Sequence, residues 1–199
     1  MPKVVDHDQR REDIAHVACQ VIAKHGFEQA TVARIARAAG YTTGMVAHYF
    51  ESKQQIVIAA LRLVLLRMEQ RLTRHSRAGD ASLITVLSEA LAIDAQRFAE
   101  CAFWTAFWGQ VPVDQKLKRI NSAVHKEYLR MYERCFAQYW PEWSQYSQKV
   151  REQVLRSVVT FINGLTAGAV TSRGDWPADK QVEQLRLQLD LLKRWAGDQ

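Results

Sequence analysis

Prolines and glycines are scarce in this sequence, with four and nine among 199 residues. Because these two residues most often end helices and form turns, their scarcity leaves long uninterrupted segments. In those segments apolar residues recur every three or four positions, the spacing that places them on one face of an α-helix. The sequence therefore predicts an all-α fold, and no segment requires a β-strand.

Cysteine is also rare. Cys19, Cys101 and Cys135 are an odd number, lie far apart, and form neither a Cys-x-x-Cys motif nor a Cys/His ligand spacing. This pattern argues against a disulfide framework and against a zinc site, and it fits a reducing cytoplasm. We predict neither a metal nor a cofactor.

Long apolar runs are missing as well. The most apolar run, "IVIAALRLVLLRM", is interrupted by Arg62 and Arg67 and falls short of the roughly 20 apolar residues that a membrane-spanning helix needs. The first residues, "MPKVVDHDQRRED", lack the apolar segment of a signal peptide. We therefore expect a soluble cytoplasmic protein without a membrane partner.

Motifs of the common enzyme classes are absent too: there is no His-Glu-x-x-His, no glycine-rich phosphate loop and no nucleophile elbow. We predict that the protein is not an enzyme. The formal charge of +6 permits an anionic partner. However, residues 1–55 carry seven basic and six acidic side chains, a net charge of +1. Any contact with a nucleic acid there must depend on where charges and helix ends are placed.

Apolar periodicity and cap residues predict about nine helices in two domains. Thr31, either Thr42 or Thr43, and Ser52 are suited to cap helices, and Gly26 to end the first one. We place a domain boundary near residue 52, between three short helices in residues 1–52 and a larger helical domain in residues 53–199. The predicted helices cover about 9–25, 31–40, 42–50, 53–74, 83–100, a short aromatic segment "CAFWTAFWG", 114–139, 148–172 and 180–195.

The segment "TVARIARAAGYTTGMVAHYF" has the character of a DNA-reading unit, in which one face of a short helix is anchored and the other is free. Val46 and Phe50 fall on one side of the second helix, and Gly44, Ala47 and His48 fall on another. Because Gly44 has no side chain, a phosphate can approach the free amides of the helix N-terminus. We expect this helix to read DNA.

Ten residues of this region are candidate DNA contacts through hydroxyl, imidazole, cationic or exposed backbone groups. Alternatives stay open for several: one of the two adjacent threonines is needed as a cap, Tyr49 could be a half-buried ring, and Arg34 could belong to a solvated face. The candidates are Thr31, Arg34, Thr42, Thr43, Gly44, Met45, Ala47, His48, Tyr49 and Lys53.

The same segment, continued to "ESK", resembles the DNA-binding region of the TetR family of bacterial repressors. Tyr41 stands where a small aliphatic residue is usual, and Ala47 where many members have a phosphate-contacting tyrosine. The resemblance implies that residues 1–52 are a helix-turn-helix DNA-binding domain and that residues 53–199 bind an effector and dimerise. It also implies a homodimer on a palindromic, double-stranded DNA operator, released when a small molecule enters the larger domain. Two reading helices would then lie about 34 to 36 Å apart. The residues that match the family pattern are Thr31, Ala36, Gly40, Thr42, Gly44, Tyr49, Phe50 and Lys53.

Aromatic residues are dense in the second domain, and such rings are either core or the walls of a cavity. "WTAFWGQ" and "FINGLTAG" resemble the C-terminal domain of the betaine-pathway branch of these repressors, which implies an effector such as choline. Rings there can hold a quaternary ammonium by cation–π attraction, with an acidic partner, although a flat aromatic ligand suits them equally. The candidate ligand-binding residues are Trp104, Phe107, Trp108, Tyr128, Tyr139 and Glu100.

The last two long helices carry apolar seams at three- and four-residue intervals. Leu187 and Leu191 lie off the seam of the final helix and widen it. We predict that both helices pair with their copies in a four-helix homodimer interface, where Gly164 and Gly168 permit close approach. Intrachain core is the alternative. For the whole protein the alternatives are an effector-independent, architectural DNA-binding protein and, less favoured, a helical enzyme.

Overall fold

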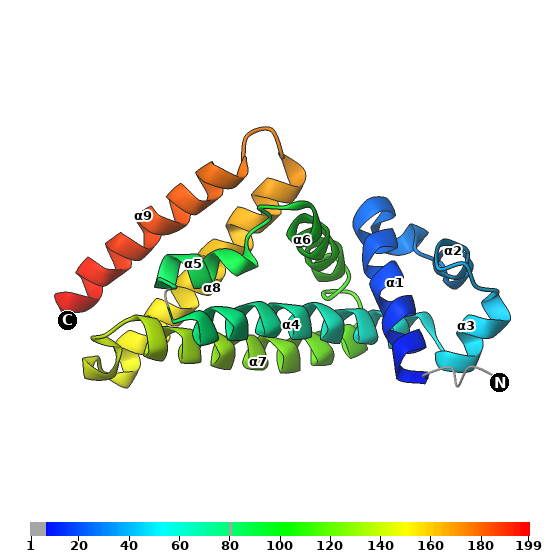
Figure 1. Cartoon of the computed structure of the whole chain (residues 1–199), viewed down its shortest axis with the longest axis horizontal. Coiled ribbons are helices and arrows are strands. Elements are labelled where there is room, and N and C mark those ends of the chain that lie inside the picture. Colours follow the sequence, from blue (N-terminus) through cyan, green and yellow to red (C-terminus); the bar gives the residue numbers. More distant parts are fainter. Residues whose placement is uncertain (1–6, 80) are drawn as a thin grey trace.

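The computed structural model describes residues 7–79 and 81–199 and is helical throughout (Figure 1). Within these ranges there are nine α-helices, two 3₁₀ helices and no strand, so the predicted all-α fold is confirmed. The helices are α1 (His7–Gln29), α2 (Val32–Ala38), α3 (Thr43–Tyr49), α4 (Lys53–Ala78), α5 (Leu83–Leu87), η1 (Ser88–Ala90), α6 (Ala95–Trp108), α7 (Gln115–Tyr139), η2 (Trp143–Gln145), α8 (Gln148–Thr171) and α9 (Ala178–Gly197).

Side-chain caps fix where the N-terminal helices begin. Thr31, Thr42 and Ser52 each accept a hydrogen bond from the backbone N–H three residues later, at 3.2, 3.1 and 3.3 Å. These bonds satisfy amides that the first helical turn leaves without partners. Since Thr42 is the cap of α3, Thr43 is its first helical residue and its hydroxyl is available for other contacts.

The prediction of one helix over 83–100 and a separate aromatic helix is wrong. The chain leaves the helical conformation at Leu91 (φ −88°, ψ 158°), and α6 starts anew behind Asp94, which accepts from the Arg97 amide at 2.7 Å. Gln181 of α9 explains the break, because its buried amide group bonds both the N–H and the C=O of Ala92, at 3.0 and 3.3 Å. These two hydrogen bonds replace the backbone hydrogen bonds that Ala92 would make in a continuous helix.

The three N-terminal helices share a hydrophobic cluster with the rest of the chain. Helix α1 packs against α4 and α6, and α2 and α3 pack beside α1 at one end of the molecule, far from the C-terminus (Figure 1). The chain bends at Gly26 (φ 79°), in a conformation that a residue without Cβ adopts readily. The fully buried members of this cluster include Ile14, Ile22, Ile35, Val46, Ile56, Leu61, Phe103 and Phe107.

A second cluster forms the body of the molecule around α8, which contacts α6, α7 and α9. Phe136 stacks on Trp143 with ring centroids 4.7 Å apart, and the Trp143 indole N–H donates to Glu133 at 3.0 Å. Among the described residues α8 is also the one helix long and apolar enough to span a membrane, which is common for the core helix of a globular fold. Nine of its side chains are buried against the neighbouring helices.

Candidate nucleic-acid interface and effector pocket

Helix α3 is anchored by one face and free on the other. Val46 is fully buried, and Phe50, directly after the helix, is 3% exposed. Thr43, Gly44, Ala47 and the other outward residues are exposed, as the helical spacing predicted. Because α3 lies at the end of the molecule in Figure 1, its free face has no other part of the described chain over it. This is the geometry that a reading helix needs to enter a groove.

Three aromatic rings meet at the C-terminal end of α3. The ring centroid of Tyr49 lies 5.3 Å from that of His48 and 4.7 Å from that of His7, at the start of α1. His48 is exposed, whereas Tyr49 and Met45 are half-buried. The Tyr49 ring thus packs against its neighbours, while the His48 imidazole stays accessible to a base edge or phosphate.

Two arginines of α1 tie the reading helix to the first helix, a role that no sequence motif indicated. Arg11 donates to the Tyr49 carbonyl, and its guanidinium lies 4.2 Å from the Phe50 ring centroid. Arg10 donates to the hydroxyl of Tyr41, and this hydrogen bond raises the pKa of Arg10. Tyr41, which departs from the family pattern, therefore links α1 to the turn before α3.

Lys53, predicted to contact phosphate, is engaged within the chain. Its ammonium donates to the Phe27 carbonyl and lies 4.4 Å from the Phe27 ring centroid, and burial lowers its pKa. Lys53 is half-buried, and its contacts with Phe27 stabilise the bend at Gly26. On α2, Thr31 and Arg34 are exposed beside α3, and Arg34 makes no side-chain bond with the described residues.

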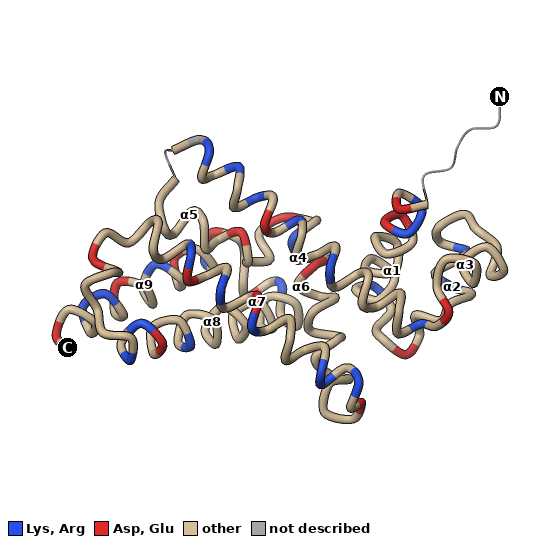
Figure 2. The backbone as a smooth tube through the Cα atoms, turned by 90° about the horizontal axis from the view of Figure 1, so that it is seen from below, with Lys and Arg blue, Asp and Glu red and all other residues tan. Residues whose placement is uncertain are grey.

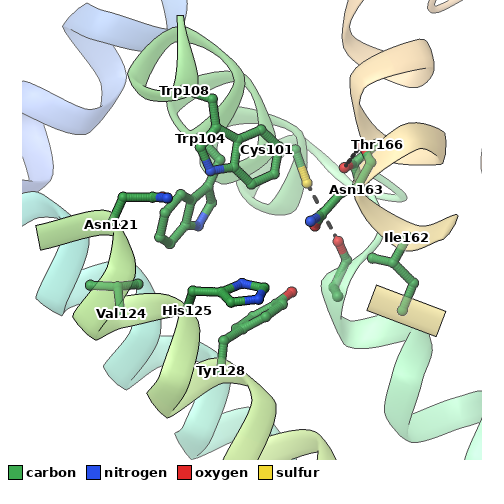
Figure 3. Close-up of a pocket in the computed structure, with 11 residues that line it drawn as sticks. Cys101, Trp104, Trp108, Asn121, Val124, His125, Tyr128, Ile162, Asn163 and Thr166 are labelled. Atoms are coloured by element: carbon green, nitrogen blue, oxygen red, sulfur yellow. Dashed lines mark hydrogen bonds between the residues drawn. The ribbon is translucent and has the colours of Figure 1, made fainter. Parts of the chain in front are cut away.

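A pocket of about 170 Å³ lies between α6, α7 and α8 (Figure 3). The centroids of Trp104 and Trp108 are 5.8 Å apart and their planes are tilted by 36°. Figure 3 shows these indoles facing His125 and Tyr128 of α7. The remaining lining residues are Ala90, Cys101, Asn121, Val124, Ile162, Asn163 and Thr166.

Three of the six candidate ligand residues line this pocket: Trp104, Trp108 and Tyr128. Phe107 is fully buried in the cluster shared with the DNA-binding helices. The structure places Tyr139 beside Cys135 in another hollow, where its hydroxyl is buried without a partner. Glu100 points to Arg71, whose guanidinium donates to it at 2.8 Å. His125, Asn121, Asn163 and Thr166 were not anticipated, because polar residues scattered over two helices show no motif.

Among the described residues no carboxylate lines the pocket, and the side-chain amides of Asn121 and Asn163 have no partner. The Tyr128 hydroxyl shares a hydrogen bond of 2.9 Å with that of Tyr132, and burial raises the pKa of Tyr128, so both stay protonated at neutral pH. Burial also raises the pKa of the Cys101 thiol to about 12, which makes it a poor nucleophile.

Glu89, which directly precedes the pocket-lining residue Ala90, forms ion pairs with three basic side chains. It lies 2.9 Å from Arg71 Nε, in an ion pair without hydrogen-bond geometry, 2.8 Å from His75 Nε2 and 3.0 Å from Arg97 Nη1. Arg71 and His75 belong to α4. This helix directly follows α1, α2 and α3, which together are called the reading head below. The ion pairs thus connect two segments. One is the segment before α6, which contributes Ala90 to the pocket, and the other is α4, the helix that follows the predicted DNA-binding residues.

Comparison with known proteins agrees with this arrangement. Residues 14–60 match the family model of bacterial regulatory proteins of the tetR family. Residues 80–193, more than half of the chain, match the BetI-type transcriptional repressor C-terminal domain. The chain belongs to the TetR family. The resemblance inferred for both regions of this TetR-family chain is therefore confirmed, and the second match identifies its larger domain as BetI-type.

Curated relatives of this TetR-family chain are transcriptional regulators, not enzymes. It is 29% identical over 110 residues to PksA of Bacillus subtilis, covering 54% of each chain. BetI of Stenotrophomonas maltophilia is 32% identical over 127 residues, 62% of this chain and 65% of the relative. BetI 1 of Chromohalobacter salexigens is 26% identical over 183 residues, 87% and 86%. The chain thus spans about half of the first relative and just under two thirds of the second.

Solved structures show the same fold. A transcriptional regulator from Rhodococcus sp. Rha1 superposes with a TM-score of 0.80 at 23% identity, over 94% of this TetR-family chain and 97% of that one. A regulator from Saccharomonospora viridis, solved in complex with choline, has a TM-score of 0.76 at 16% identity, over 92% and 96%. Both identities are low, so these neighbours establish the fold alone.

Proposed function

We propose that this TetR-family chain is a cytoplasmic transcriptional repressor that acts as a homodimer on a palindromic operator and is released by a small effector. The observation that carries the proposal is the free face of α3, where Thr43, Gly44, Ala47 and His48 stand exposed at one end of the molecule. Residues 1–52 would bind DNA, and residues 53–199 would dimerise and hold the effector. An exposed helix face of this kind is available to a partner, and the proposed partner is operator DNA.

The effector class follows from the pocket. Its volume of about 170 Å³ is close to that of a cavity of about 150 Å³ that holds benzene. Only a small ligand fits without rearrangement. The tilted indoles and the Tyr128 ring suit a rounded cation, each ring contributing about 0.5 to 2 kcal/mol. The free amides of Asn121 and Asn163 can bond an oxygen of the same ligand.

We therefore favour a small quaternary ammonium compound over a flat aromatic one. The neighbour that binds choline supports this choice. Glu100 is not the acidic partner in this account, because Arg71 already neutralises it. An effector-independent architectural role fits less well, because the pocket between α6, α7 and α8 is open, not filled by side chains.

Dimerisation would use the exposed side of α8 and α9. Leu187 and Leu191, one turn apart on α9, are 52% and 50% exposed. Gly164 of α8 has nothing near the position of a Cβ atom. Gly168 is different, because the Trp176 indole nitrogen of the same chain would lie 3.2 Å from its Cβ. Close approach of a second copy is therefore expected at Gly164.

Release would arise because the effector favours a dimer whose reading heads are wrongly spaced, so that its binding lowers operator affinity. The test is a gel shift on DNA flanking the gene, titrated with choline, betaine aldehyde and single-ring neutral aromatics. We expect release by the cations. In Trp104→Ala, the concentration for half release should rise about 2- to 30-fold, with DNA affinity unchanged.

Trp104→Phe is the control, because it keeps an aromatic face at the same position and should lose less than Trp104→Ala. Release by neutral aromatics alone would replace the proposed effector class with the flat one. Retained DNA binding that no ligand changes would favour the architectural alternative instead.

A further inference from the structure

A second hollow, of about 600 Å³, lies between α1, α4 and α6, apart from the aromatic pocket. This volume is in the range of small-molecule sites in proteins. One wall belongs to the first helix of the reading head, and the other two belong to the body of the protein. The cleft is lined by His16, Cys19, Gln20, Arg67, Gln70, Arg71, Arg74, Ala95, Gln96, Ala99 and Glu100.

The cleft is basic because three arginines of α4 share one face. Arg67, Arg71 and Arg74 are spaced four and three residues apart, which places them one above the other on successive helical turns. Figure 2 shows the basic positions recurring along α4. The single lining carboxylate, Glu100, is 4% exposed and is bonded to Arg71 at 2.8 Å.

Two of these guanidinium groups lack a counterion. Arg74 forms no ion pair with the residues that the structure describes, and Arg67 contacts only His16, at 3.0 Å between Nη1 and Nδ1. Since Arg67 can only donate, the His16 nitrogen accepts and the ring is neutral. Burial, together with Arg67, lowers the pKa of His16, in agreement with a neutral ring. Arg71, in contrast, is fully paired with Glu89 and Glu100.

Neutral polar groups complete the lining. The Gln70 side chain has no hydrogen-bond partner among the described residues, and the Gln20 amide lies 3.3 Å from His16 Nε2. Guanidinium and amide groups together bind carboxylates and phosphates, the guanidinium with two parallel bonds. The chemistry of the wall thus selects oxyanions and disfavours the cation for which the aromatic pocket is suited.

DNA is not the expected occupant. Gln20 is nine residues from Arg11, which holds α3, and at about 100° per residue the two side chains lie on opposite faces of α1. The cleft therefore opens away from the reading helix. Moreover, Arg67 and Arg74 are seven residues apart, about 10 Å along the helix axis, which suits a small molecule with two or more anionic groups.

We propose that this cleft is a second ligand site, which binds a small anion carrying two or more carboxylate or phosphate groups between Arg67 and Arg74. The bound anion would replace the weak contact of Arg67 with His16 by charge-assisted bonds. Because His16 and Gln20 belong to the reading head, the anion would bridge α1 to α4. It would thereby restrain the movement of the DNA-binding helices relative to the body.

Isothermal titration calorimetry on the full chain without DNA or effector tests this site, using citrate as the carboxylate probe and inorganic pyrophosphate as the phosphate probe. Ionic strength is held constant with sodium chloride. We expect saturable binding of at least one probe, one per chain. The double variant Arg67→Gln/Arg74→Gln should bind at least 10-fold more weakly.

The control is Arg62→Gln/Arg119→Gln, which removes the same charge from exposed positions outside the cleft and should bind like the original chain. The tighter probe identifies the anion class. No saturable heat up to about 10 mM of either probe, or equal loss in both double variants, would overturn the proposal. Since the assay contains neither operator nor effector, its result is independent of the repressor function, and Trp104→Ala should leave it unchanged.

Discussion

Replacing Gly44 with glutamate should lower operator affinity by about 100-fold, or about 2.7 kcal/mol. A Cβ at this position meets nothing closer than the Thr42 hydroxyl, at 4.0 Å, so the side chain fits without strain. A carboxylate in the first turn of α3 also favours the helix, by about 0.3 to 1 kcal/mol. The loss would therefore come from repulsion by phosphates that approach the helix N-terminus. The measurement is a gel shift or fluorescence anisotropy at fixed salt.

Two variants separate this effect from others. Gly44→Gln adds a similar volume without charge and should lose much less affinity than Gly44→Glu. Gly174→Glu adds the same charge at an exposed position in the turn before α9, also with free space around it, and should bind normally. If Gly44→Glu binds the operator like the unmodified chain while remaining folded, α3 does not face the DNA.

The double variant Leu187→Glu/Leu191→Glu should be a folded monomer that no longer binds the operator tightly. Both side chains are about half exposed in the single chain, so each is expected to gain about 1 kcal/mol when a second copy covers it. A dimer has four such leucines, and their loss should raise the dimer Kd about a thousand-fold. Sedimentation equilibrium should find the 22.8 kDa chain alone, in contrast to twice that mass for the unmodified protein.

Leu66→Glu provides the matched control, because Leu66 is 47% exposed but lies on α4, away from the predicted interface. It should remain dimeric and bind DNA normally. A Leu187→Glu/Leu191→Glu protein that stays dimeric would move the interface elsewhere. Dissociation of Leu66→Glu instead would point to the groove between α1 and α4, which Leu66 lines.

The parts of the fold predicted correctly are those that depend on neighbours in the sequence. Thr31 and Ser52 cap the helices that follow them, and Val46 and Phe50 are buried while Ala47 is exposed. Each outcome follows from helical geometry within a few residues. The break after Leu91 was missed because its cause, Gln181, is 89 residues away from the Ala92 backbone that it bonds.

The effector pocket was only half predictable for a related reason. Trp104 and Phe107 lie three residues apart on the same helix and both contact the cluster beneath the reading head, yet only Trp104 also lines the pocket. Helical spacing groups such rings but does not say which of them faces a cavity. The role of Glu100 was not predictable either, because it depends on an ion pair with Arg71, which lies on another helix.

The domain division at residue 52 remains a prediction. Residue 53 opens α4, but Ile56, Val57 and Leu61 of that helix belong to the same cluster as α1 to α3. Phe103 and Phe107 of α6 join it as well. A movement of α6 when the pocket fills would therefore be transmitted to the reading head through packed side chains, in addition to the ion pairs of Glu89.

In the proposed dimer, two reading heads are held at one spacing on the operator and at another with effector. Electron spin resonance can measure this spacing after the exposed Lys24 of α1 is replaced with cysteine and labelled. The native thiols are buried, and burial raises the pKa of Cys19 to about 12 and of Cys135 to about 11, so the label should react selectively.

We predict a narrow distance distribution on the operator, consistent with α3 helices about 34 to 36 Å apart. Choline should shift that distribution as the DNA is released. An unchanged distribution with choline, or no dipolar coupling between labels in the operator complex, would contradict the account.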